Sequence, residues 1–191
     1  MITLYKQTTP MFNNNITGLF IRNRAEKAGR PTVRPEMSPV DWLLEAFALI
    51  GILGFLGFVI YQYPRLPESI PSHFNGAGMP DDYSSKSSIL ALLGIGMFIY
   101  VLMSLIALVP HQFNFTVKIT PQNALKQYTM AIRLIRYLKV VIIWLFFYIS
   151  YATVRVVAKE DSGLGAWFMP ITLAGILVPV IVYIILAGRK R

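Results

Sequence analysis

Cysteine is absent from this chain of 191 residues, and histidine occurs only twice. Without cysteine, the protein has neither a disulfide framework nor a thiol nucleophile. Catalytic zinc sites commonly use two or three histidines, so the presence of only His73 and His111 is weak evidence for such a site. The sequence also has no HExxH, no GxSxG and no phosphate-cradling glycine loop. These absences count against the commonest catalytic classes.

Charged residues are also scarce: they form 14% of the chain, against 55% hydrophobic residues. A soluble domain of this size could hardly bury so much apolar surface in one core. Four apolar runs, at about 42–61, 89–109, 137–157 and 164–187, reach the roughly 20 residues that a helix needs to cross a hydrocarbon layer. Because backbone groups inside a membrane must bond internally, the sequence predicts an all-α integral membrane protein with four transmembrane helices.

Basic residues are distributed unevenly around these runs. Of the 18 lysines and arginines, six precede the first run, five lie between positions 110 and 139, and three follow the last run. The positive-inside rule therefore predicts that both termini and segment 110–136 face the cytoplasm, while the loops at 62–88 and 158–163 face outside. The formal net charge of +9 then reflects membrane topology, and no nucleic-acid partner is predicted.

The pattern predicts two regions of different kinds. Residues 1–37 carry scattered charges and no long apolar run, which predicts a disordered basic cytoplasmic tail. Residues 38–188 are expected to form the four-helix membrane domain. Its first helix should begin at Ser38 and Pro39, because serine caps a helix and proline suits the first turn, where no amide donor is needed. Glu45 is expected either to snorkel to the cytoplasmic interface or to bind a basic residue of segment 110–139.

A cytoplasmic amphipathic helix is predicted before the third span. Thr120 and Pro121 repeat the pattern of a cap followed by proline. Such a helix either lies along the inner leaflet or continues into the membrane as one long helix. Its basic face is either a docking surface for an acidic cytoplasmic partner or a determinant of topology. Its apolar stripe recurs at helical spacing, at Leu125, Tyr128, Ile132 and Ile135.

Segment 62–88, between the first two spans, is expected to be the functional surface. Pro71 and Pro80 restrict the backbone and remove amide donors, so neither a long helix nor a central strand is expected there. Asn75 followed by Gly76 favours a tight turn. We therefore expect an ordered loop that folds back on itself and brings four polar side chains together: His73, Asn75, Asp81 and Asp82.

Three segments of the chain carry a resemblance to a known family: YPRLPESIPSHFNGAGMPDDYSSK, then FNFTVKITPQNALKQY, then GLGAWFMP. Together they resemble the family of the domain of unknown function 1648, which comprises small bacterial membrane proteins. That domain is shared with the N-terminal part of the sporulation-delaying-protein immunity protein. The likeness covers about residues 37–188. The loop pattern of the family is matched at Leu66, Pro67, Ile70, Pro71, His73, Phe74, Asn75, Gly78, Pro80, Asp81 and Lys86.

The resemblance implies a location and a class of function. The family implies the bacterial cell membrane. The immunity protein protects its producer against a secreted membrane-active peptide toxin, and it is held to sequester a cytoplasmic transcriptional repressor. By this resemblance, the chain is expected to correspond to the four-span part that carries the motif, without the additional spans of the longer immunity protein.

Our main hypothesis is therefore a multi-pass membrane protein whose outer loop recognises a membrane-active peptide or an envelope component and gives protection or signalling. The expected partners are the lipid bilayer, that outer ligand and a cytoplasmic repressor. No cofactor and no metal is assigned. The residues expected to bind are His73, Phe74, Asn75, Gly78, Pro80, Asp81 and Lys86.

Two alternatives stay open at this point. The loop contains His73 and Asp81, which are ligand types for a divalent ion, so a membrane-embedded metal-dependent enzyme is the first alternative. A small-solute transporter is the second. The predicted spans lack ionisable residues near the bilayer centre, where ion and proton pathways usually place them, which counts against transport.

Overall fold

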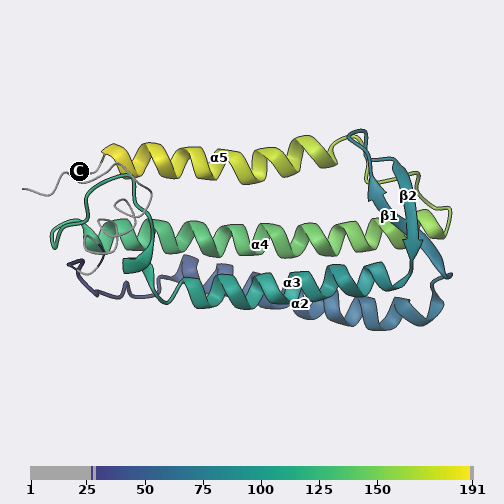
Figure 1. The fold of residues 1–191 in the computed structure, drawn as a ribbon, viewed down its shortest axis with the longest axis horizontal. Coiled ribbons are helices and arrows are strands. Elements are labelled where there is room, and N and C mark those ends of the chain that lie inside the picture. The colour runs from purple at the N-terminus through teal and green to yellow at the C-terminus, as the bar shows by residue number, and fades with distance from the viewer. Residues whose placement is uncertain (1–26, 28, 190–191) are drawn as a thin grey trace, which may run out of the picture.

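Four long helices form the body of the protein in the computed structural model, which describes residue 27 and residues 29–189 (Figure 1). Helix α4 lies in the middle and packs against the other three. Each helix is long and apolar enough to cross a membrane, which confirms the prediction of a multi-pass helical membrane protein. Most of the predicted tail 1–37 lies outside the described residues. The four helices are α2 (Pro39–Gln62), α3 (Ser87–Ile106), α4 (Ala124–Val157) and α5 (Phe168–Arg189).

Helix α2 begins where the sequence predicts. The Ser38 backbone amide donates to the Asp41 carboxylate at 2.9 Å, and the Asp41 amide donates back to the Ser38 hydroxyl at 3.4 Å. This reciprocal pair is a capping box, which satisfies donors that the first turn of a helix leaves free. The short 3₁₀ helix η1 (Tyr63–Arg65) follows α2 directly and leads the chain into the next segment.

The main hydrophobic core lies between α2, α3 and α4, toward one end of the bundle. Phe55 and Val59 of α2, Ile89 and Leu93 of α3, and Ile143 of α4 are buried in it. The outward faces of the helices are apolar and exposed, as expected for surfaces that meet lipid. Helix α5 is the extreme case, because only Ala187 is buried along its length.

The all-α prediction needs one correction, because the loop between α2 and α3 contains a β-hairpin. Strand β1 (Ser69–Phe74) pairs antiparallel with β2 (Pro80–Ser85), and their register is irregular around His73. Proline is tolerated here because both strands of a two-stranded sheet are edges. The sequence argument excluded a central strand correctly, but the pair of edge strands was missed. Figure 1 shows the hairpin capping the end of the bundle opposite the C-terminus.

The predicted cytoplasmic amphipathic helix is not a separate element among the described residues. After η2 (Pro110–Gln112), a turn-rich segment leads directly into α4, which runs unbroken over 34 residues. At 1.5 Å per residue this is about 51 Å, longer than the roughly 30 Å hydrocarbon layer. The continuous form has a simple cause, since no proline or glycine interrupts the sequence from Leu125 to Val157. Of the predicted stripe, Tyr128 and Ile132 are buried, whereas Leu125 is exposed.

Candidate functional site

The tip of the hairpin is shaped by Asn75. Its side-chain oxygen accepts hydrogen bonds from the amides of Ala77, at 2.9 Å, and Met79, at 3.1 Å. Its backbone amide donates to the Met79 carbonyl, and its carbonyl accepts from the Gly78 amide. The predicted turn at Asn75 and Gly76 is therefore present, with the asparagine oxygen committed to holding the turn.

The tip also docks on the connection between α4 and α5. The Gly78 carbonyl accepts a 2.7 Å bond from the Leu164 amide, and the Tyr148 hydroxyl donates to the Leu164 carbonyl. Gly78 has a φ of +78°, a conformation that favours glycine. A Cβ atom on Gly163 would overlap the Gly78 carbonyl oxygen, so glycine is required for this approach. The family pattern included Gly78, but its docking partner could not be found from sequence.

The base of the hairpin is held by a polar pair and by the core. The Lys86 amine lies 2.9 Å from the Glu68 carboxylate, and the Lys86 amide donates to the Glu68 carbonyl. The hydrogen bond to Glu68 raises the pKa of the Lys86 amine above its ordinary value. The Lys86 amine also lies 5.5 Å from the ring centroid of Tyr63. Beneath this pair, Ile70 is buried in the main core. The hairpin is thus fastened at its base and at its tip.

The polar side chains of the hairpin converge only in part. His73 Nδ1 lies 2.6 Å from an Asp81 carboxylate oxygen, and both side chains are exposed, His73 by 67% and Asp81 by 41%. Asp82 instead accepts from the amide of Tyr83, and Asn75 is used in the turn. Among residues 27 and 29–189, no group of three or more histidine, aspartate or glutamate side chains is arranged to hold a metal ion. The convergence is therefore limited to one exposed pair, His73 and Asp81.

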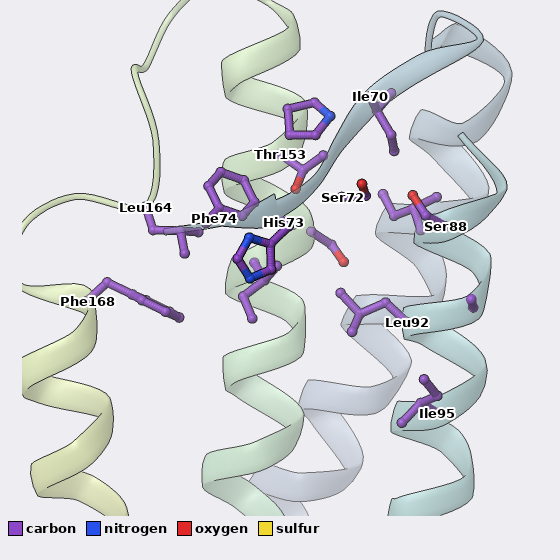
Figure 2. A pocket seen from close by; sticks show the side chains of 15 residues that line it. Ile70, Ser72, His73, Phe74, Ser88, Leu92, Ile95, Thr153, Leu164 and Phe168 are labelled. Carbon is purple, nitrogen blue, oxygen red and sulfur yellow. The ribbon is translucent and has the colours of Figure 1, made fainter. Parts of the chain in front are cut away.

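A crevice of about 380 Å³ opens beneath β1. Figure 2 shows His73 and Phe74 of β1 above it, Leu92 and Ile95 of α3 on one side and Phe168 of α5 on the other. Its walls are mostly apolar, with a few hydroxyl-bearing side chains between them. Of the predicted binding residues, His73 and Phe74 line this crevice, while Asn75, Gly78, Pro80, Asp81 and Lys86 do not.

Ser150 of α4, missed by the sequence analysis, lies on this crevice. Its side chain is 1% exposed, and its hydroxyl oxygen has no hydrogen-bond partner among the described residues. Thr153, one turn further along α4, is also buried and lines the same crevice. A buried hydroxyl without a partner costs about 1–3 kcal/mol, so its presence calls for an explanation. The available signal was a serine and a threonine three residues apart in an apolar run, which places both on one helix face.

A second polar site lies toward the other end of α2 and α4. We call it the charged cluster, and it consists of Asp41, Glu45, Arg133, Arg136 and Lys139. Arg133 and Arg136 each approach an Asp41 oxygen to 3.2 Å. Glu45 lies 3.2 Å from Arg136 and 2.6 Å from Lys139, which confirms the second of the two expectations for Glu45. Lys139 is 1% exposed, and it also donates to the Ser104 hydroxyl of α3 at 2.9 Å.

Comparison with known proteins adds one match. Residues 49–99 match the model of a domain of unknown function, DUF1648. The matched stretch contains most of α2, the whole hairpin and the first part of α3. No curated protein and no solved structure matches the chain. The match thus covers the hairpin and the adjoining parts of the two helices that carry it, and it assigns them no chemistry.

Proposed function

We propose that this membrane protein binds an amphipathic ligand, a membrane-active peptide or an envelope component, at the hairpin end of its bundle. Binding would give protection against that ligand or signal its presence. The single observation that carries the proposal is the crevice beneath β1, where apolar walls surround the buried Ser150 hydroxyl that has no partner among the described residues. Such a site favours an apolar group that brings one hydrogen-bonding atom with it.

The energetics of Ser150 support this reading. The hydroxyl is left without a partner in the ligand-free protein, at a cost of about 1–3 kcal/mol. A ligand atom that bonds to it removes this cost on binding. The same ligand would cover Leu92 and Ile95, which line the crevice beside the hydroxyl. Affinity and orientation would therefore come from different parts of one site.

The charge of the hairpin supports a cationic ligand. Segment 66–86 contains Glu68, Asp81 and Asp82 but only one basic residue, Lys86, in a chain whose formal net charge is +9. Asp81 forms an exposed pair with His73, which lines the crevice. An acidic rim on a basic protein attracts cationic partners and speeds their encounter. Many amphipathic helices that lie on membranes carry lysine and arginine on their polar face.

The topology that accompanies this proposal rests on the distribution of basic residues. The positive-inside rule puts the hairpin outside the cell and both termini in the cytoplasm. The resemblance to the immunity protein supports a bacterial cell membrane and a cytoplasmic repressor as the partner that would receive the signal. The metal-dependent alternative is weaker, because His73 and Asp81 gain no third ligand among the described residues.

A binding experiment tests the proposal directly. The full chain is placed in lipid nanodiscs and titrated with a fluorescent synthetic amphipathic peptide of about 20 leucine and lysine residues. We expect saturable binding above that of empty nanodiscs. Ser150→Ala should weaken it about fivefold, because the peptide loses one hydrogen bond in a water-poor site. Ile95→Trp, which fills the crevice from a half-exposed position, should weaken it more.

Ser84→Ala is the matched control, since Ser84 lies on the exposed strand β2 and does not line the crevice. Its affinity should stay within about twofold of the original protein. The proposal is wrong if Ile95→Trp binds the peptide as tightly as the original protein does, or if binding equals that of empty nanodiscs.

A further inference from the structure

The charged cluster carries an excess of positive charge. Arg133, Arg136 and Lys139 supply three cations, whereas Asp41 and Glu45 supply two carboxylates. Among the described residues, no further carboxylate pairs with these side chains. Asp41 and Lys139 are each 1% exposed, so part of this charge is held away from water. Buried charge is costly unless it is balanced, which leaves the cluster one negative charge short.

Arg133 is the member of the cluster that reaches outward. Its side chain is 43% exposed. Its Nε atom donates to Asp41, and its Nη2 atom donates to both Asp41 and Ser38. Its Nη1 atom has no partner among the described residues. A guanidinium has five N–H donors in a planar fork, so the free edge can still hold an oxyanion.

Arg133 also lines a groove of about 380 Å³ between α2, α4 and α5. The rest of this groove is almost entirely apolar, with Leu44 of α2, Leu134 of α4 and Val182 of α5 among its walls. A second hollow of about 580 Å³ continues along α4 and α5 and shares Tyr137 with the first. One cation thus stands beside a long apolar path.

The dimensions of the path match one leaflet of a bilayer. From Arg133, the two hollows follow α4 through Tyr137 to Trp144 and beyond. Eleven residues of helix rise about 16 Å, close to half of a hydrocarbon layer of roughly 30 Å. Arg133 contacts Ser38 and Asp41 at the first turn of α2, where the apolar span begins. Arg133 therefore lies at the end of the apolar span of α2, and the apolar path leads from it along α4.

We infer that this groove binds a phospholipid with a net negative head group, whose phosphate contacts Arg133 and whose acyl chain follows the path between α4 and α5. The phosphate would supply the negative charge that the cluster lacks. Basic sites between transmembrane helices are known places for anionic lipid head groups. The lipid would also fill the space along α5, a helix with only one buried residue.

The test compares lipids that differ in one feature. The purified full chain in a nonionic detergent is titrated with dioleoyl phosphatidylglycerol, with dioleoyl phosphatidylcholine and with glycerol 3-phosphate, and binding is followed by native mass spectrometry and by thermal stability. We expect phosphatidylglycerol to bind most tightly, because only it combines net negative charge with acyl chains. Arg133→Gln should weaken that binding about fivefold to tenfold, since one head-group cation is lost.

Two further variants make the result decisive. Val182→Trp fills the groove but leaves every member of the charged cluster in place, and it should also weaken phosphatidylglycerol binding. Arg155→Gln removes the same kind of charge from the same helix near the hairpin end, away from the groove, and should change it by less than about twofold. Equal binding of both lipids, an unaffected Val182→Trp, or an equal loss in Arg155→Gln would overturn the inference. Stabilisation by glycerol 3-phosphate as strong as that by phosphatidylglycerol would overturn it too, because the site would then bind a free phosphate compound.

Discussion

The two ends of the bundle handle charge in opposite ways. At the hairpin end, His73 and Asp81 are exposed and bond to each other within one hairpin. In the charged cluster, Asp41 is buried and bonds to Arg133, 92 residues away in the sequence, on another helix. The first arrangement is local and open to solvent, whereas the second joins helices and buries two of its members, Asp41 and Lys139.

The difference indicates which end stabilises the fold and which end is available for recognition. An exposed ion pair contributes little to the free energy of unfolding, because each charged group is solvated by water almost as well when the pair is broken. A buried charge that loses its partner is costly, so the charged cluster keeps α2 and α4 in one relative position. Under the proposed function, the hairpin end would use its polar groups on a ligand, because the fold depends on them less than on the charged cluster.

The largest expected effect comes from breaking the charged cluster. Arg133 and Arg136 each lie 3.2 Å from the Asp41 carboxylate, and Asp41→Ala removes this shared partner. The substitution also removes the capping box that Asp41 forms with Ser38. We expect a loss of about 3–5 kcal/mol in the free energy of unfolding, as for other buried pairs that lose one partner. Unfolding by titration with a denaturing detergent measures it.

Asp82→Ala is the matched comparison at the hairpin end, because Asp82 is exposed and, within the described part of the chain, its carboxylate bonds only to the amide of Tyr83. The free energy of unfolding of this variant should stay within about 0.5 kcal/mol of that of the original protein. Similar losses in the two variants would show that the charged cluster does not stabilise the fold more than the hairpin end does.

An intermediate effect is expected from loosening the tip of the hairpin. Gly163→Ala puts a Cβ atom where the Gly78 carbonyl oxygen lies, so the connection after α4 and the hairpin must separate. Overpacking of this kind costs about 1–3 kcal/mol. Hydrogen exchange at the Leu164 amide, which bonds to that carbonyl, should become faster. Gly76→Ala, in the hairpin tip with open space around it, should leave the exchange rate at Leu164 unchanged. An equal acceleration there would argue against the docking contact as the cause.

The smallest expected effect concerns the pair of Lys86 and Glu68. Because the folded-state pKa of Lys86 is raised above the ordinary value of 10.5, the pair stabilises the fold below that pH, and this contribution is lost as the pH rises through the raised pKa. Melting temperatures measured from pH 8 upward should therefore fall more steeply above about pH 10.5 in the original protein than in Lys86→Met. Parallel curves would mean that the pair adds nothing to stability.

Much of the fold could be predicted from residue order alone. The spans follow from the length of the apolar runs, because a helix needs a set number of residues to cross the hydrocarbon layer. The start of α2 follows from Ser38 and Pro39, and the turn follows from Asn75 and Gly76, because capping and turn formation depend on neighbours within a few residues. Each of these features is governed by local or compositional physics.

Tertiary structure decided the rest, because it depends on residues far apart in the chain. The hairpin forms where proline content argued only against a central strand, and its tip is held by Leu164, about 86 positions after Gly78. Ser150 is an ordinary small residue in an apolar helix until packing buries its hydroxyl beneath β1. The sequence left two interpretations of Glu45 open, a snorkelling side chain or an ion pair. The packing of α2 against α4 selects Arg136 and Lys139 as its partners, because the cost of burying a charge depends on what surrounds it.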